Sequence, residues 1–321
     1  MARKKLTGGG WAGTFLNAPR GDGRVLKSMK INDLESIAIL GLGLLGGSLG
    51  LALERVFPRV KRHGYSHRQS TRAKALEAGT VDEVFASAAE AAGRADLVIL
   101  ASPISIFPDL LREIAPVLAP GSVVTDVGST KRLPVKWAGE ILPKTLEFIG
   151  SHPMAGSEQR GVEFARGDLF DNAQCIITPV AASTKDTREF INAFWGKLGM
   201  HVSVMSPAQH DRTVARISHL PHVLAAALVN CSDAKEMLLC GKGFLDTTRI
   251  ASGPPEIWHD ILSTNAANVN QAIGKLIKEL AAMQAALRDG RDGAITRKLQ
   301  QAQTKRNELV AKKLSRKELP T

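Results

Sequence analysis

Short apolar runs recur along the chain from residue 36 to residue 205, and each is followed by a stretch whose apolar positions have helical spacing. Short apolar runs bounded by turn residues are typical of buried strands, and their alternation with helices indicates a parallel sheet covered on both faces. The pattern predicts strands over residues 36–40, 61–65, 96–101, 122–127, 146–150, 174–178 and 201–205. It predicts helices between them over residues 44–57, 70–78, 104–118, 133–142 and 185–198.

The pattern changes near residue 206, where alternation gives way to alanine- and leucine-rich helical stretches such as 223–230 and 256–287. We therefore expect an α/β fold, a Rossmann-type doubly wound parallel sheet followed by an all-helical dimerisation domain. The expected parts are a poorly ordered basic extension over residues 1–30, a dinucleotide-binding domain over 31–205, a helical substrate and dimerisation domain over 206–290, and a basic C-terminal helix or tail over 291–321.

The first predicted strand runs directly into a glycine-rich turn and then into an apolar helix. Gly41 permits the tight turn, Gly43 lets the backbone approach a pyrophosphate, and Gly46 lets the helix pack closely on the strand. Because strand, glycine spacing and helix occur together, the segment predicts a dinucleotide site rather than a turn without a ligand. The expected cofactor-binding residues here are Gly41, Leu42, Gly43, Leu44, Leu45 and Gly46.

The end of the second predicted strand bears on the type of cofactor. NAD sites place Asp or Glu about 20 residues past the glycines, on the ribose 2′-OH, whereas NADP sites lack that charge and offer Arg. Here Ser66, His67 and Arg68 follow the strand, and each can donate to a 2′-phosphate. We expect NADP as the preferred cofactor and NAD as the second choice. The alternatives are an exposed loop whose arginine binds no ligand and an enzyme that uses both cofactors.

Ligands of an open parallel sheet bind beyond the carboxyl ends of its strands, where this chain carries several polar groups. Ser102 and Pro103 follow the third predicted strand, Ser129 follows the fourth, and His152 follows the fifth. An imidazole can accept a proton near neutral pH, which hydride loss from a carbinol carbon requires. The alternative is a histidine that only forms a hydrogen bond to a loop carbonyl. A position beside the cofactor favours the catalytic role.

The helical part carries further candidates. His219 and His222 are three residues apart and can share one helical face. That spacing would suit a metal ion, but the motif lacks the third ligand of a zinc enzyme, so we expect no metal; a pair of core histidines is the structural alternative. Arg249 offers a cation for a substrate carboxylate, and Asp246 either pairs with it or with another exposed charge.

The formal net charge of +11 is concentrated at the two ends of the 321-residue chain. It is roughly +5 over residues 1–34 and roughly +6 over residues 288–321, so the body between them is close to neutral. With few aromatic side chains and no basic stripe on the body, we expect no nucleic-acid partner. No apolar run reaches membrane-spanning length, and three cysteines without paired spacing favour a reducing cytoplasm.

Six motifs stand in a fixed order over roughly residues 36–290. They are Gly41-x-Gly43-x-x-Gly46, Asp126-Val127-Gly128-Ser129-x-Lys131, His152-Pro153-Met154-Ala155-Gly156-Ser157-Glu158, His210-Asp211, Ser218-His219-Leu220-Pro221-His222, and Asp246-x-x-Arg249 followed by Trp258. Each motif alone is modestly specific, whereas their order and spacing are highly specific. Together they resemble the prephenate/arogenate dehydrogenase family, which makes precursors of tyrosine.

The resemblance implies an NAD(P)-dependent oxidative decarboxylation, in which a ring carbon loses hydride and the ring carboxylate leaves as carbon dioxide. It implies that His152 deprotonates the 4-hydroxyl of the substrate and that Ser129 holds this hydroxyl near the nicotinamide. It assigns Arg249 to a substrate carboxylate and places His222 and His219 in the substrate pocket. Glu158, Asp211 and Asp246 would form polar supports around the arginine.

The resemblance also implies a homodimer built through the helical domains, in which Trp258 reaches toward the partner's site. The expected protein is a cytoplasmic oxidoreductase of tyrosine biosynthesis that converts prephenate to 4-hydroxyphenylpyruvate. The alternatives are conversion of arogenate to tyrosine, another hydroxyacid dehydrogenase, and an NADP-binding sensor without turnover. We expect neither a C-terminal regulatory domain nor an N-terminal chorismate mutase segment, and therefore no tyrosine feedback through a separate domain.

Overall fold

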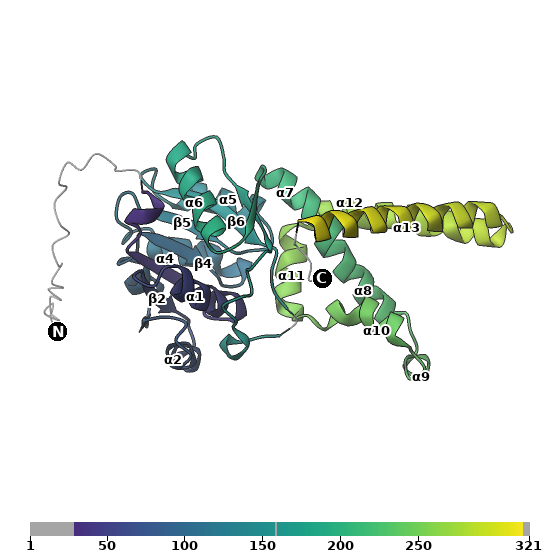
Figure 1. The fold of residues 1–321 in the computed structure, drawn as a ribbon, viewed down its shortest axis with the longest axis horizontal. Helices are drawn as coiled ribbons and strands as arrows, with labels where there is room; N and C mark the ends of the chain where they lie inside the picture. Colours follow the sequence, from purple (N-terminus) through teal and green to yellow (C-terminus); the bar gives the residue numbers. More distant parts are fainter. Residues whose placement is uncertain (1–28, 158, 317–321) are drawn as a thin grey trace, which may run out of the picture.

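The computed structural model describes residues 29–157 and 159–316. The basic extension expected over residues 1–30 lies almost entirely outside the described residues, and so does Glu158. Figure 1 shows an α/β domain followed by a helical domain, from which a long helical hairpin extends. The expected fold class is therefore confirmed.

An eight-stranded sheet forms the centre of the first domain, in the order β3-β2-β1-β4-β5-β6-β7-β8. Its strands are β1 (Ser36–Leu40), β2 (Lys61–Tyr65), β3 (Glu83–Phe85), β4 (Leu97–Leu100), β5 (Val123–Asp126), β6 (Glu147–Pro153), β7 (Gln174–Thr178) and β8 (His201–Val204). The chain runs outward from β1 to β3 and then returns to β4 on the other side of β1. An open α/β sheet binds its ligand at this reversal, between the ends of β1 and β4.

Helices cover both faces of the sheet. They are α1 (Leu44–Val56), α2 (Gln69–Glu77), α3 (Ala88–Ala92), α4 (Phe107–Ile114), α5 (Arg132–Ile141) and α6 (Lys185–Lys197). Alternate residues of β1 enter two different cores: Ile37 and Ile39 pack with α1 and α6, while Ala38 and Leu40 pack with α3 and α4. A strand buried on both faces reads as a continuous apolar run, which is why the sequence pattern locates β1 correctly.

The sheet differs from the predicted pattern in three respects. β3 and α3 lie in a stretch for which no element is predicted, because three and five residues are too few to show a period. β7 is antiparallel to β6, where a parallel strand is expected. β6 runs to Pro153 rather than residue 150, because its pairing with β7 continues past the end of its pairing with β5. His152 therefore lies inside a strand and not in the loop after it.

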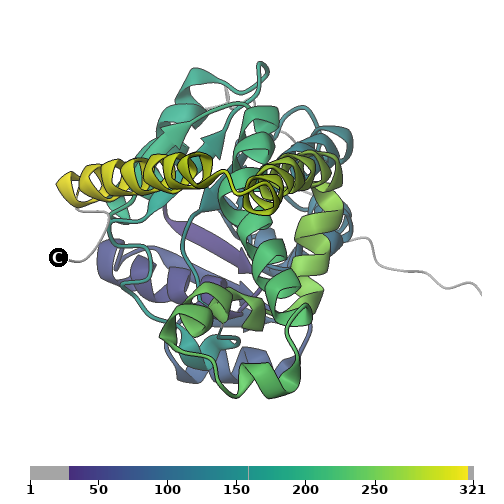
Figure 2. The same ribbon diagram turned by 90° about the vertical axis from the view of Figure 1, so that its right-hand side faces the viewer.

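The helical domain begins at Pro207, close to the predicted change of pattern, and Ser206 caps its first helix by accepting from the Gln209 N–H. Its helices are α7 (Pro207–Val214), α8 (Leu220–Asn230), α9 (Ala234–Met237), α10 (Lys242–Thr248), α11 (Pro255–Thr264), α12 (Ala266–Arg288) and α13 (Asp292–Ser315). Figure 2 shows α12 and α13 projecting toward the viewer in front of the α/β domain. Over the described residues, no helix combines the length and the apolar character needed to cross a membrane.

Candidate functional site

The turn after β1 can form only with glycine at two of its positions. Gly41 has φ +123°, and a Cβ there would lie 2.5 Å from the carbonyl carbon and oxygen of Ala101. A Cβ on Gly46 would lie 1.8 Å from the carbonyl oxygen of Gly41, so α1 packs directly on the turn. At Gly43 the space around the Cβ position is empty to 4 Å, and the first turn of α1 has no side-chain cap. Open space before uncapped helical N–H groups fits a pyrophosphate.

A cavity of about 1190 Å³ opens in front of this turn and extends to the helical domain. Its wall contains every predicted cofactor-binding residue except Gly46, which is packed on Gly41 behind the wall. The predicted residues in the wall are Gly41, Leu42, Gly43, Leu44, Leu45, Ser66, His67, Arg68, Ser102, Pro103, Ser129, Arg249 and Trp258. Because both domains contribute, a cofactor bound at the glycine turn and a substrate held by the helical domain can meet in one cavity.

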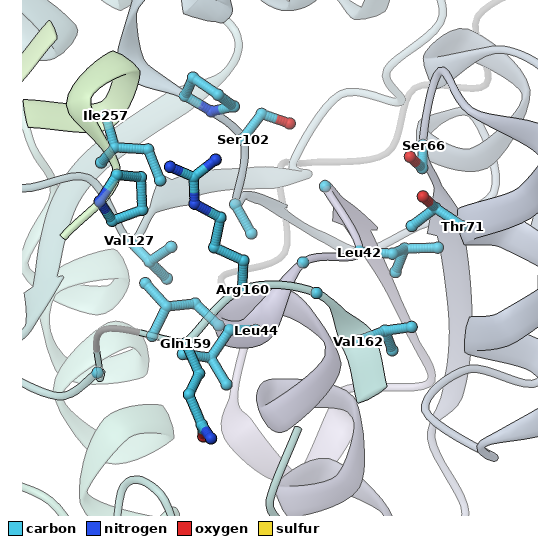
Figure 3. A pocket seen from close by; sticks show the side chains of 18 of the residues that line it. Leu42, Leu44, Ser66, Thr71, Ser102, Val127, Gln159, Arg160, Val162 and Ile257 are labelled. Atoms are coloured by element: carbon cyan, nitrogen blue, oxygen red, sulfur yellow. The ribbon is translucent and has the colours of Figure 1, made fainter. Parts of the chain in front are cut away.

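The end of the cavity beside β2 is rich in hydroxyl and cationic side chains. Figure 3 shows Ser66 and Thr71 together at this end, whereas Val127 and Ile257 lie at the opposite end. Ser70, Thr71 and Lys74 of α2 also line the cavity, and none of the three is a predicted site residue. Nζ of Lys74 lies 3.5 Å from Oε1 of Glu163, which also lines the cavity. The residues that follow β2 thus present donors to an anionic group.

His152 forms a hydrogen bond to His210, which belongs to one of the six motifs but was given no role of its own. Its Nδ1 lies 2.9 Å from Nε2 of His210, and Nδ1 of His210 lies 2.8 Å from Oδ1 of Asp211. Both imidazoles are buried, and burial is the main cause that lowers the pKa of each. The neighbouring His210 and the Lys131 cation lower the pKa of His152 further. His152 is therefore neutral at pH 7, as a general base must be.

The buried Asp211 carboxylate forms hydrogen bonds that join the two domains. Its carboxylate accepts hydrogen bonds from the backbone N–H groups of Lys131 at 2.8 Å and Arg132 at 3.0 Å, in addition to His210. These donors lie at the start of α5, so the buried carboxylate ties α5 to α7. The role that the resemblance implies for Asp211, as a support around Arg249, stays a prediction.

Ser129 is presented to the cavity by a rigid turn after β5. The buried Lys131 ammonium pairs with the buried Asp126 carboxylate, which also accepts from the N–H groups of Gly128 at 2.9 Å and Ser151 at 3.0 Å. A buried ion pair whose remaining lone pairs are hydrogen-bonded holds its surroundings in one geometry. The same carboxylate therefore fixes the Ser129 turn and the part of β6 that carries His152.

The imidazole of His219 is buried at the junction of two helices. His219 ends η4 (Ala215–His219), a turn of π-helix that joins α7 to α8 and precedes Pro221, which has no N–H to donate. The Asn265 side-chain amide donates to Nδ1 of His219 at 3.3 Å, so its proton is on Nε2. Among the described residues Nε2 has no partner, and burial lowers the pKa of His219 to about 4.

His222 lies on the face of Trp258, a residue of the cavity wall. Burial lowers the pKa of His222, and its Nδ1 is buried without a hydrogen-bond partner among the described residues. Neither His219 nor His222 is in the cavity wall, but both imidazoles pack against Trp258, which is. Buried polar groups are normally hydrogen-bonded, so their free nitrogens could bind a polar partner. Within the described ranges there is no cluster of three or more His, Cys, Asp or Glu that could hold a metal ion.

The remaining predicted residues are divided between the cavity and the surface. Arg249 follows α10 directly and lines the cavity, whereas Asp246 is exposed on α10 and lies outside the wall. Arg160, which the sequence analysis missed, also lines the cavity and pairs with Glu256 of α11 at 3.2 Å. Figure 3 shows Arg160 projecting into the cavity between the two domains. No motif pointed to Arg160, whereas the position of His210 beside Asp211 was a usable signal.

The glycine turn, the cavity that joins it to a second domain and the neutral His152, tied through Asp126 to the turn that carries Ser129, are typical of a dehydrogenase that uses a nicotinamide dinucleotide. The family described as prephenate dehydrogenase, nucleotide-binding domain, matches residues 49–204. Its companion, described as prephenate dehydrogenase, dimerization domain, matches residues 206–301. The chain belongs to the prephenate dehydrogenase family.

Individual relatives agree with this assignment. The chain is 35% identical over 253 residues to the prephenate dehydrogenase of Bacillus subtilis (strain 168), covering 77% of this chain and 68% of that protein. The crystal structure of prephenate dehydrogenase from A. aeolicus with hydroxyphenyl propionate and NAD+ has a TM-score of 0.80 and 32% identity, over 86% of this chain and 98% of that one. The crystal structure of Synechocystis arogenate dehydrogenase has a TM-score of 0.73 and 30% identity, over 85% of this chain and 99% of that one. Similar proteins are thus named for two different substrates.

Proposed function

We propose that this chain oxidises prephenate with NAD(P), releasing carbon dioxide and 4-hydroxyphenylpyruvate for tyrosine biosynthesis. The observation that carries the proposal is the neutral, buried His152, whose strand Asp126 ties to the turn that presents Ser129 to a cavity shared by both domains. Relatives named prephenate dehydrogenase at 35% identity support it. The test is formation of reduced cofactor from prephenate by the purified chain.

Each step has a group in the chain to perform it. When bound along residues 41–45, a nicotinamide cofactor supplies the hydride acceptor. His152 takes the proton of the substrate 4-hydroxyl, and Ser129 orients that hydroxyl. Arg249 binds a substrate carboxylate, and the free Nε2–H of His219 donates to a substrate oxygen. Loss of the ring carboxylate then makes the ring aromatic.

The preferred cofactor is NADP. Ser66, His67 and Arg68 all line the cavity at the end of β2, and Lys74 of α2 adds a second cation. The chain has no carboxylate between Tyr65 and Lys74 that would repel a 2′-phosphate. Since the A. aeolicus relative was crystallised with NAD+, the choice of cofactor needs a direct comparison of the two.

Arogenate is the second candidate substrate, favoured by the likeness to Synechocystis arogenate dehydrogenase. Arogenate carries an ammonium group where prephenate carries a keto oxygen, so a single charge separates the two. Arg249, His152 and Ser129 would bind features common to both molecules. Prephenate is our choice because two relatives that are 35% identical and the A. aeolicus structure are named for it.

The active form is a homodimer formed through the helical domain. Large apolar side chains remain exposed on its helices and on the turn after α9: Leu238, Leu239, Leu245, Ile277, Leu280, Leu287, Leu299 and Leu309. Exposed apolar surface of this extent marks an interface, and the matching family is described as a dimerization domain. We place the enzyme in the cytoplasm, since Cys175, Cys231 and Cys240 are all free thiols.

A further inference from the structure

We propose that His210, held by Asp211, fixes the tautomer of His152 and makes Nε2 of His152 the basic atom. The proposal rests on the proposed function, in which His152 receives the hydroxyl proton. It gives His210 and Asp211 the role of positioning residues, since both act through His152.

The contact of His210 with Asp211 shows which ring nitrogen of His210 carries a proton. Oδ1 of Asp211 lies 2.8 Å from Nδ1 of His210, and the same oxygen accepts from the Lys131 N–H at 2.8 Å. Oδ2 accepts from the Arg132 N–H at 3.0 Å. An ionised carboxylate only accepts hydrogen bonds. Nδ1 of His210 must therefore carry a proton and donate it to Asp211.

Nε2 of His210 faces His152 and accepts a hydrogen bond from it. Burial lowers the pKa of His210, although the Asp211 carboxylate opposes this, so the ring is neutral and has a single N–H. With that proton on Nδ1, Nε2 of His210 can only accept. It lies 2.9 Å from Nδ1 of His152, which must therefore be the donor. The lone pair of neutral His152 is then on Nε2.

Nε2 of His152 is then the atom that receives the proton of the substrate hydroxyl. The O–H bond of the substrate hydroxyl breaks and an N–H bond forms at Nε2 of His152. The hydroxyl oxygen keeps the electron pair, which forms the carbonyl as hydride leaves the ring carbon. The imidazolium of His152 still donates through Nδ1 to His210, which donates to Asp211. The carboxylate stabilises the new charge through one intervening imidazole, as a triad aspartate does through direct contact.

The test compares two substitutions of His210 with a matched control. Glutamine retains an oxygen that can accept from Nδ1 of His152, whereas phenylalanine offers no acceptor. His201→Gln changes an exposed histidine of β8 outside the site. In protein labelled with ¹⁵N-histidine, long-range ¹H–¹⁵N spectra distinguish protonated from unprotonated ring nitrogens. The signals of His152 are identified by their loss in His152→Asn.

We expect the wild type, His201→Gln and His210→Gln to show His152 with a protonated Nδ1 and a bare Nε2. His210→Phe should lose this single tautomer, and its kcat should fall at least about tenfold with KM changed less than about twofold. In His210→Gln, kcat should stay within about threefold of the wild type.

A protonated Nε2 on His152 in the wild type would overturn the proposal, and so would unchanged kcat in His210→Phe. If His210→Phe does not fold, the spectra of the wild type and of His210→Gln decide the question alone. The spectra do not depend on turnover, so a chain that shows the expected tautomer but oxidises neither prephenate nor arogenate refutes the proposed function and not the arrangement of His210.

Discussion

The indole of Trp258 lies flat on the imidazole of His222, with ring centroids 3.5 Å apart and an angle of 12° between the planes. The stack joins α8 to α11 and forms part of the cavity boundary. It fits because Gly253 has no side chain: a Cβ there would lie 2.6 Å from Nε1 of Trp258 and 3.2 Å from Cε1 of His222. Gly253 thus sets the position of both rings.

Gly253→Ala should therefore displace the stack and weaken substrate binding. We expect KM for the substrate to rise roughly tenfold, about 1.4 kcal/mol of binding free energy, with a smaller change in kcat. Gly139→Ala on α5 is the control, because its Cβ position is empty to 4 Å and the residue is exposed. Steady-state kinetics of both variants check this. Equal KM values in the wild type and Gly253→Ala would show that the stack does not shape the substrate site.

His152→Asn should abolish the base while it retains the hydrogen bond to His210. Asparagine keeps an N–H that can donate to Nε2 of His210 but has no basic nitrogen. We expect kcat to fall by roughly two to four orders of magnitude, the usual contribution of general base catalysis, with a smaller change in KM. Steady-state kinetics at about pH 7.5 measure the fall in kcat. A variant that retains near-normal kcat would refute the catalytic assignment of His152.

Ser66→Asp should shift the cofactor preference from NADP toward NAD, because a carboxylate at the end of β2 repels a 2′-phosphate. The ratio of kcat/KM for NADP to that for NAD should fall by about ten- to a hundredfold, or roughly 1.4–2.7 kcal/mol. Ser66→Ala, which removes the hydroxyl without adding a charge, should change the ratio much less. The proposed preference is wrong if the unmodified chain uses both cofactors with equal kcat/KM.

The buried histidines should make the protein less stable in mild acid. The pKa of His219 is lowered from 6.5 to about 4, so the unfolded chain binds this proton first as the pH falls. Its stabilising contribution is complete above pH 6.5 and is lost as the pH falls toward 4, by up to about 3 kcal/mol over that window. The lowered pKa values of His63, His152, His210 and His222 act in the same direction.

Urea unfolding at pH 7 and pH 5 measures this loss of free energy. His219→Gln cannot be charged, so its free energy of unfolding should fall less between the two pH values than that of the wild type. His201→Gln, at an exposed position, should behave like the wild type. A wild type equally stable at both pH values would contradict the burial of neutral histidines.

Sequence pattern predicted those features of the fold that depend on local periodicity. β1, β2 and β7 have the predicted bounds, and the glycine turn lies where its spacing required. The antiparallel direction of β7 was not predicted, because an apolar run has the same appearance in either direction. β3 and α3 were missed since a short element shows no period.

The candidate site was predicted where one strand end or one motif contains the signal, as for Ser102, Ser129 and the residues after β2. The hydrogen bonds of the site were not predicted, because they join residues that are far apart in the chain. His152 and His210 are 58 positions apart, and Asp211 and Lys131 are 80 apart. Their contact depends on how α7 packs against α5 and β7, which sequence spacing does not encode.

The most direct test of the central claim supplies the purified chain with NADP and either prephenate or arogenate, and follows both NADPH and the aromatic product. We predict that prephenate yields NADPH and 4-hydroxyphenylpyruvate in equal amounts, with kcat/KM at least equal to that for arogenate. A kcat/KM ratio above about tenfold in favour of arogenate, roughly 1.4 kcal/mol, would overturn the choice of substrate. No reduced cofactor from either molecule, with NADP or with NAD, would contradict the account as a whole.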